Sequence, residues 1–180
     1  MRGRVGLLLA AGASRRFGAE DKLLAPLRGR ALVEHAAAAM RAVPLDLRIA
    51  VVASAAVAVR LEGFRIVAVP PGGQAESLRA GVRAAGQAER LLVALGDMPD
   101  VTPEHLARVL AAATDASPSA SHDGDAVLPP ACFPRLLLPA LAALEGDRGA
   151  GSLLRGLKPA QLVAAPALLR DIDRPDDLGG

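Results

Sequence analysis

The sequence predicts an α/β protein: a Rossmann-like three-layer α/β/α sandwich with a mostly parallel sheet. Short apolar runs rich in Val, Ile and Leu recur without polar alternation, as in parallel strands that are buried on both faces. Helical patterns lie between these runs, and this alternation predicts an open sheet with right-handed crossovers. The four predicted strands are Val5–Ala11, Arg48–Ala53, Arg65–Val69 and Leu91–Leu95.

Three helices are predicted among these strands. Ala31–Ala42 is rich in helix formers and is followed two residues later by a proline, which cannot continue a helix. Ala75–Ala85 places apolar residues at helical spacing. The third helix is predicted to begin at Thr102, a natural N-cap, with Pro103 in its first turn, and to extend for about ten residues.

The rest of the chain has a weaker pattern. Residues Ala116–Gly124 are rich in Ser, Asp and Pro and are interpreted as a loop that could contain a short strand. Ala126–Phe133 is a strand candidate whose two prolines place it at an edge or a bend of the sheet. Pro134–Leu144 is a helix candidate and Gln161–Ala165 a last strand candidate. Neither a repeat nor a linker divides the chain, so residues 1–180 are predicted to form one domain.

Composition excludes several classes of protein. Hydrophobic residues make up 52% of the chain, which excludes disorder by composition. Aromatic residues make up 2%, too few for stacking platforms on single-stranded nucleic acid, and the net charge of +2 does not require a polyanion, so we expect no nucleic-acid partner. The single Cys132 excludes an internal disulfide and is expected to be a core residue. The run Val5–Ala11 is too short to span a bilayer, so we expect a cytoplasmic protein without a membrane partner.

The loops that follow three of the predicted strands carry polar and glycine residues. The first strand leads into the glycine-rich, basic stretch Ala10–Gly18, with Lys22 close behind. The third run ends in Pro70–Gly73, and the fourth ends in Gly96–Pro99, which contains an aspartate. The carboxyl ends of parallel strands meet at one edge of a sheet, where ligands bind. These residues are therefore predicted to surround one crevice.

The first of these loops is a candidate phosphate site. Gly12 and Gly18 allow close approach of the backbone, and free amides in such a loop can cradle an anion. Arg15, Arg16 and Lys22 add positive charge. The loop has neither the Gly-Lys-Ser/Thr of a Walker A motif nor the dinucleotide motif Gly-x-Gly-x-x-Gly. We favour phosphate binding over an ordinary strand-to-helix turn with solvated arginines.

Two acidic positions are candidates for a metal site. Asp97 ends a buried strand, where a carboxylate can hold Mg²⁺ together with phosphate oxygens and water, although it could instead cap the following turn. The basic glycine loop at the same edge favours the metal interpretation. The stretch Asp171–Asp177 could supply a second metal contact. The alternative there is a solvated acidic turn, which we favour for Asp176 and Asp177.

Taken together and in order, these motifs resemble the MobA-like NTP transferase family, and within it the molybdenum cofactor (molybdopterin) cytidylyltransferases. The resemblance extends over nearly the whole chain and implies a single nucleotidyltransferase domain, with a fold of the nucleotide-diphospho-sugar transferase type. The segments that carry it are Leu9–Gly18, Lys22–Leu24, Gly73–Gly81, Gly96–Pro99, Pro129–Pro134, Gly146–Ala150 and Asp171–Leu178.

The resemblance also implies roles for individual residues. Arg16 and Lys22 would neutralise the triphosphate, and Asp97 would bind Mg²⁺, which makes these three the implied catalytic residues. Asp173 would complete the metal site. Ser77 would contact the base or ribose together with the glycine turn before it. The implied nucleotide-binding residues are Ala10, Ala11, Gly12, Ala13, Ser14, Gly72, Gly73 and Ser77.

The implied reaction is the transfer of CMP from CTP to a phosphorylated acceptor such as molybdopterin, with release of pyrophosphate. The Ala-Ala-Gly at residues 10–12 resembles the cytidylyltransferases, whereas guanylyltransferases of the family tend to have Ala-Gly-Gly there. The implied partners are a nucleoside triphosphate, a phosphorylated small molecule and a molybdoenzyme. Alternatives are a guanylyltransferase, transfer to another phosphorylated molecule, a non-catalytic molybdenum cofactor binding or delivery protein, and an oxidoreductase on the same fold.

Overall fold

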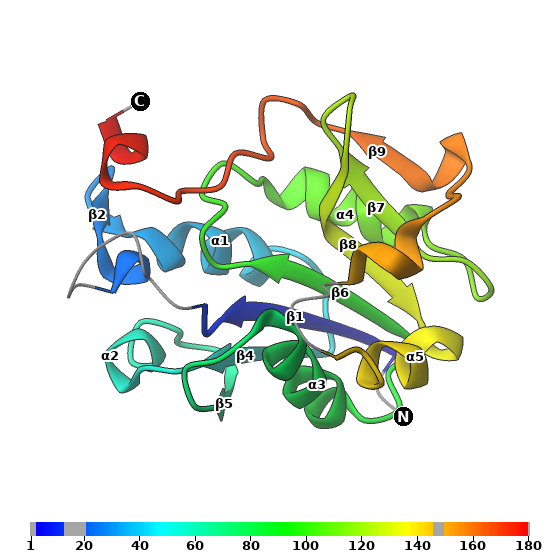
Figure 1. Cartoon of the computed structure of the whole chain (residues 1–180), viewed down its shortest axis with the longest axis horizontal. Helices are drawn as coiled ribbons and strands as arrows, with labels where there is room; N and C mark the ends of the chain where they lie inside the picture. The colour runs from blue at the N-terminus through cyan, green and yellow to red at the C-terminus, as the bar shows by residue number, and fades with distance from the viewer. Residues whose placement is uncertain (1–2, 13–20, 146–149, 180) are drawn as a thin grey trace.

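A mostly parallel sheet of seven strands forms the centre of the computed structural model, which describes residues 3–12, 21–145 and 150–179 (Figure 1). The strand order is β5-β4-β1-β6-β8-β7-β9, and among these strands β8 alone runs antiparallel to the rest. The strands are β1 (Arg4–Ala10), β4 (Leu47–Val52), β5 (Arg65–Ala68), β6 (Arg90–Leu95), β7 (Ser119–His122), β8 (Val127–Pro134) and β9 (Leu162–Ala164). The predicted α/β class with a mostly parallel sheet is therefore confirmed.

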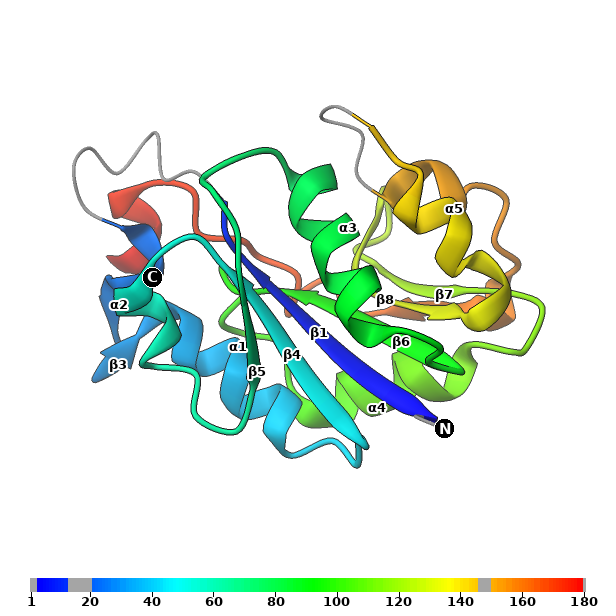
Figure 2. The ribbon, with the colours of Figure 1, turned by 90° about the horizontal axis from the view of Figure 1, so that it is seen from below.

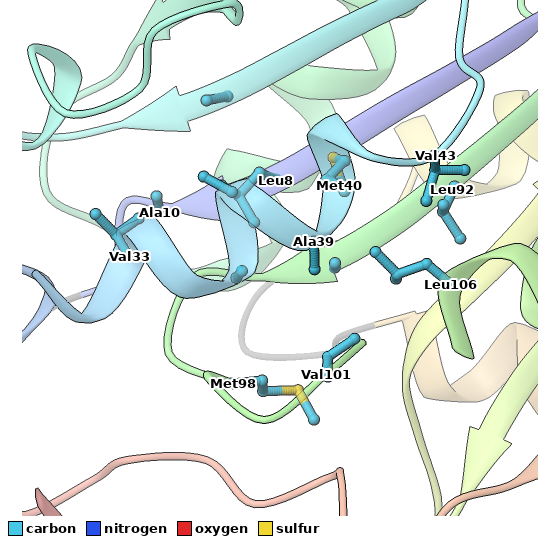
Figure 3. Close-up of a cluster of buried hydrophobic side chains, with 14 of the residues drawn as sticks. Leu8, Ala10, Val33, Ala39, Met40, Val43, Leu92, Met98, Val101 and Leu106 are labelled. Carbon is cyan, nitrogen blue, oxygen red and sulfur yellow. The ribbon is translucent and has the colours of Figure 1, made fainter. Parts of the chain in front are cut away.

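Helices cover both faces of the sheet and give the three predicted layers (Figures 1 and 2). Helices α1 (Leu32–Arg41) and α4 (Pro103–Ala112) pack on one face, and α3 (Gln74–Ala85) and α5 (Leu138–Ala142) pack on the other. Alternate residues of β1 enter the two clusters, because successive side chains of a strand point to opposite faces. Figure 3 shows part of the α1/α4 cluster. It includes Leu8, Met40 and Leu106.

Shorter elements complete the fold. Helix α2 (Ala55–Ala58) follows β4, and strands β2 (Pro26–Leu27) and β3 (Arg30–Ala31) form a separate hairpin. Single 3-10 turns lie at Lys22–Leu24, Arg135–Leu137, Ala150–Leu154, Pro159–Gln161 and Pro175–Gly179. In the part of the chain that the structure describes, none of the helices has the length and apolar character needed to cross a bilayer.

Local sequence explains how the main helices begin and pack. The side chain of Thr102 accepts a hydrogen bond of 3.2 Å from the backbone N–H of His105, as predicted for the N-cap of α4. The Glu34 carboxylate accepts the backbone N–H of Ala31 at 2.7 Å, which satisfies a donor at the start of α1. Gly81 lets α3 lie close against β1, since a Cβ at this position would be 2.4 Å from Leu7 Cδ1.

The proline-containing strand was predicted to lie at an edge or a bend of the sheet, and the structure shows an irregular strand that is not at an edge. Strand β8 lies between β6 and β7 and pairs with both. On the β7 side, Ala120 pairs with Ala131 and Ser121 pairs with Leu128, so the two prolines fall within a break in the register. A bulge of this kind accommodates residues that have no N–H to donate. The predicted bend is therefore present, but inside the sheet.

The prediction that the third apolar run is buried on both faces was wrong. Among the described residues, strand β5 is at the edge of the sheet and pairs only with β4, and its residues are exposed except for the half-buried Val67. The apolar composition of this run could not distinguish an edge strand from a central one, because the covering of each face is set by the rest of the fold. Cys132, by contrast, is fully buried in β8, as expected.

Candidate active site

A pocket of about 230 Å³ lies at the carboxyl ends of β1 and β6. Residues from all three predicted loops line it: Gly12 after β1, Gly72 after β5 and Asp97 after β6. Lys22 and Ser77 line it as well. Ala11, which precedes Gly12, lines it too, so the topology brings six of the predicted site residues to one place, because the three loops leave the same edge of the sheet.

Lys22 connects three distant parts of the chain. Its Nζ donates hydrogen bonds to Asp97 Oδ2 at 2.7 Å, to the carbonyl oxygen of Ile172 at 3.0 Å and to Asp173 Oδ1 at 3.3 Å. Asp21 caps the 3-10 turn that carries Lys22, because its carboxylate accepts the N–H of Leu23. In Figures 1 and 2 the C-terminal segment, coloured red, lies beside this blue turn. The ammonium is therefore fixed between two carboxylates.

The electrostatics of this contact keep Lys22 charged. Lys22 is only 9% exposed, and burial by itself lowers the pKa of an ammonium. The hydrogen bond and the charge of Asp97, followed by those of Asp173, outweigh this effect and raise the pKa of Lys22 above its ordinary value of 10.5. Lys22 is therefore a cation at neutral pH.

Asp97 has one carboxylate oxygen engaged and one unused. Oδ2 accepts from Lys22, whereas Oδ1 is buried and has no hydrogen-bond partner among the described residues. A buried acceptor without a partner is costly, which makes Oδ1 a natural ligand for a cation. The backbone oxygen of Asp97 accepts the N–H of Ile172 at 3.0 Å and so attaches the C-terminal segment to this loop.

The donor set fits a divalent metal that is shared with a nucleotide. Within residues 3–12, 21–145 and 150–179, no group of three or more His, Cys, Asp or Glu side chains is arranged to hold a metal. The protein ligands here would be Asp97 and Asp173. Mg²⁺ commonly takes one or two carboxylates and completes its octahedron with phosphate oxygens and water. The unused Oδ1 of Asp97 is consistent with this arrangement.

Asp177 orients Asp173, contrary to the prediction that it is merely solvated. Its Oδ2 accepts the backbone N–H of Arg174 at 2.7 Å and that of Asp173 at 2.9 Å. These two hydrogen bonds, with Arg174 the stronger influence, lower the pKa of the Asp177 carboxyl. An Asp close behind a predicted loop is a common side-chain cap for backbone N–H groups, and this signal could have identified it.

A second group of charges, missed by sequence analysis, supports the loop that carries Asp97. Asp100 binds Arg28 through Oδ1 at 2.8 Å and Arg170 through Oδ2 at 3.2 Å. Arg28 has a φ of +50°, which is uncommon for a residue with a side chain. The pairs connect the β2–β3 hairpin, the Asp97 loop and the C-terminal segment. Arg28 and Asp100 also line a hollow of about 510 Å³, which is larger than the pocket at Lys22 but does not include the Lys22 cluster.

The remaining predicted residues differ in where they lie. Ala13, Ser14 and Arg16 are outside the described residues. Ala10 is buried in the α1/α4 core cluster, so any nucleotide contact would come from its backbone (Figure 3). Ala11 lines the pocket.

The glycine turn and α3 form another part of the pocket wall. Gly73 is the N-cap of α3, and Gly72 and Ser77 line the pocket. The Ser77 hydroxyl donates to the Gly73 carbonyl at 3.4 Å, so this residue also holds the first turn of its helix. Gln74, which was not among the predicted site residues, lines the pocket from the same turn and is exposed. Its position at the start of α3 was the available signal.

The chain is similar to known proteins over most of its length. Residues 6–163 match the model of the MobA-like NTP transferase domain. The chain is 30% identical to the purine catabolism protein PucB of Bacillus subtilis (strain 168), over 96% of this chain and 93% of PucB. It is 36% identical to nicotine blue oxidoreductase of Paenarthrobacter nicotinovorans, over 83% of this chain and 80% of that protein.

A solved structure shows the same architecture. The crystal structure of Rv0371c from Mycobacterium tuberculosis H37Rv matches with a TM-score of 0.85 at 31% identity, over 97% of this chain and 95% of that one. A structure of Rv0371c in complex with manganese matches with a TM-score of 0.80 at 30% identity, over 98% and 96% of the two chains.

Proposed function

The chain belongs to the MobA-like NTP transferase family of nucleotidyltransferases, and we propose that it passes CMP from CTP to a phosphorylated small molecule and releases pyrophosphate. The observation that carries this proposal is the meeting of Lys22 with Asp97 and Asp173 beside the pocket formed by the glycine loops. A cation and two carboxylates at the carboxyl edge of a parallel sheet suit a triphosphate and its metal ion.

The proposed reaction needs no covalent intermediate on the protein. A terminal phosphate oxygen of the acceptor forms a bond to the α-phosphorus of the NTP. The bond from this phosphorus to the oxygen that bridges to the β-phosphate breaks, and pyrophosphate leaves with that oxygen. Catalysis of this type depends on positioning and charge neutralisation. Cys132 takes no part, since burial raises the pKa of its thiol to about 12.

Each part of the site has a proposed role. Lys22, and Arg16 in the loop before it, neutralise charge on the phosphates and on the leaving group. Asp97 and Asp173 hold the divalent ion, which supplies charge neutralisation at the α-phosphate when it is bound. We propose Mg²⁺ as this ion, and the manganese complex of Rv0371c supports a divalent metal. Residues 10–14 offer amides to the triphosphate, while the Gly72–Gly73 turn and Ser77 face the nucleoside.

The proposed reaction also specifies the nucleotide and the acceptor. CTP is proposed from the Ala-Ala-Gly at residues 10–12, and GTP is the alternative. Molybdopterin or the molybdenum cofactor is the proposed acceptor, with a molybdoenzyme as the protein that would receive the product. We also propose that residues 1–180 act as one domain in the cytoplasm.

A screen of the four NTPs against phosphorylated acceptors, read by pyrophosphate release, tests this function. Release with CTP and a pterin phosphate is the expected result, and release with GTP or with another acceptor would correct the substrates. If CTP and Mg²⁺ raise the melting temperature but no acceptor gives pyrophosphate, a cofactor binding or delivery protein becomes the better explanation.

The name of nicotine blue oxidoreductase favours a second candidate, an oxidoreductase on the same fold. The chain has no Gly-x-Gly-x-x-Gly dinucleotide motif, which argues against a nicotinamide or flavin dinucleotide bound in that way. A reaction that oxidises or reduces a dye without consuming any NTP would support this candidate.

A further inference from the structure

We propose that the Lys22 ammonium is a built-in substitute for the divalent cation, and that it makes binding of the metal and binding of the triphosphate cooperative. Without ligands it lies between the Asp97 and Asp173 carboxylates. When both ligands bind, the ammonium would leave the two carboxylates, which would then hold the metal, and would move to the phosphates. The identity of the two ligands rests on the proposed function, but the exchange itself is a property of these three side chains.

The distances place the ammonium where a shared metal would bind. Nζ contacts Asp97 Oδ2 at 2.7 Å and Asp173 Oδ1 at 3.3 Å. A Mg²⁺ ion that used these same two oxygens would need to be about 2.1 Å from each, so it could not bind them while Nζ stays in contact with both. The ion and the ammonium therefore compete for the same pair of carboxylates.

Burial explains why the ammonium stays there when no ligand is bound. The Lys22 side chain is 11% exposed and that of Asp97 is 19% exposed, so each charge needs the other. The carbonyl of Ile172 holds the ammonium from a third direction. Both carboxylates contact the same ammonium, and its positive charge offsets the repulsion between their negative charges.

The neighbouring pocket explains why a nucleotide would release the ammonium. Lys22 lines this pocket together with Gly12 and Gly72, where the triphosphate is proposed to bind. A metal that binds alone must separate Lys22 from two carboxylates. A metal that arrives with a triphosphate replaces these contacts by contacts with phosphate oxygens, so each ligand lowers the cost of binding the other.

This exchange predicts that removing Lys22 strengthens binding of the metal alone. Lys22→Met keeps most of the side chain and removes its charge. Mn²⁺, followed by its electron paramagnetic resonance signal, would be titrated into the full chain without nucleotide. We expect the Kd for Mn²⁺ to fall about 5–150-fold, the range of ordinary coupling between two ligands. A non-hydrolysable CTP analogue should strengthen Mn²⁺ binding to the wild type but have little effect on the variant.

Arg174→Met is the matched control, because it removes the same charge from an exposed position next to Asp173. Its effect should stay within about twofold, since water and salt screen exposed charges. Unchanged or weaker Mn²⁺ binding in Lys22→Met would overturn the proposal, and would indicate that the metal binds Asp97 Oδ1 while Lys22 stays on Oδ2.

A thermal melt keeps the test decisive where folding is affected. If Lys22→Met lowers stability, Mn²⁺ should raise its melting temperature more than that of the wild type, and the opposite order would contradict the exchange. None of these measurements uses turnover. A protein that shows the exchange but releases no pyrophosphate with any NTP would retain this proposal and lose the proposed function.

Discussion

Replacing Asp97 with alanine tests the cluster at the centre of the site, since it removes the main partner of a nearly buried ammonium. The structure contains an instructive contrast. The Lys22–Asp97 pair is 2.7 Å long, with side chains that are 11% and 19% exposed. The Arg90–Asp115 pair is 2.6 Å long, but the Asp115 side chain is 96% exposed. Because the two distances differ by only about 0.1 Å while the burial of the two aspartates differs greatly, the comparison separates the effect of desolvation from that of contact.

The expected magnitudes differ accordingly. Removing one partner of a buried pair costs about 3–5 kcal/mol, and the lower end applies here because Asp173 remains beside Lys22. Removing an exposed partner costs about 0–1 kcal/mol. For a chain of this length, 1 kcal/mol corresponds to about 2–4 °C in Tm. Asp97→Ala should therefore lower Tm by roughly 6–12 °C, and Asp115→Ala by at most about 4 °C.

Differential scanning calorimetry measures both shifts, and pyrophosphate release measures the effect on the proposed reaction. Asp97→Ala should reduce turnover by about 10²–10³-fold, as expected for a charge that acts mainly in the transition state. Asp97→Asn keeps the shape and an acceptor oxygen, so its stability should lie between those of Asp97→Ala and the wild type. If Asp97→Ala melts like the wild type, the Lys22 cluster is not a stabilising contact. If its turnover is near normal, Asp97 is not a metal ligand.

Three further predictions concern other parts of the chain. Gly81→Ala should lower the free energy of unfolding in a urea titration, because overpacking against β1 costs about 1–3 kcal/mol, which exceeds the gain of about 1 kcal/mol in helix propensity. Gly151→Ala is the control: its Cβ enters open space, and the free energy of unfolding should change by less than about 0.5 kcal/mol. Cys132 should react with a thiol reagent only as fast as the protein unfolds, and rapid labelling of the native protein would contradict this. Burial raises the pKa of its thiol from 9.0 to about 12, so the contribution of this thiol to stability is fully present below pH 9 and is lost as the pH rises through about 12. Asp177→Ala should weaken Mn²⁺ binding in the presence of nucleotide about 10-fold, because it releases the backbone of Asp173. Asp177→Asn keeps an acceptor oxygen and should retain most of the affinity. Equal affinities in the two variants would show that the hydrogen bond to Asp177 does not position the metal ligand.

The fold class and the position of the site could be predicted from local patterns in the chain. Apolar runs such as Val5–Ala11 indicate parallel strands, and the polarity of a parallel sheet places the loops after such strands at one edge. By that rule Gly12, Gly72 and Asp97 are expected to lie together, and all three line one pocket. Thr102 likewise marked the start of α4 through its capping chemistry.

What only the tertiary structure decided depends on contacts between distant residues. The exposure of β5, and the insertion of β8 between two strands, follow from which elements cover which edge. The contact of Lys22 with Asp173, and the hydrogen bond that the Asp173 backbone N–H donates to Asp177, depend on how the C-terminal segment crosses the end of the sheet. A residue pattern encodes the periodicity of one element at a time. Side-chain burial and ion pairs between residues as far apart as Lys22 and Asp173 are set instead by how the elements pack together. This packing depends on the shapes of all the side chains in the neighbouring layers, which no local pattern contains.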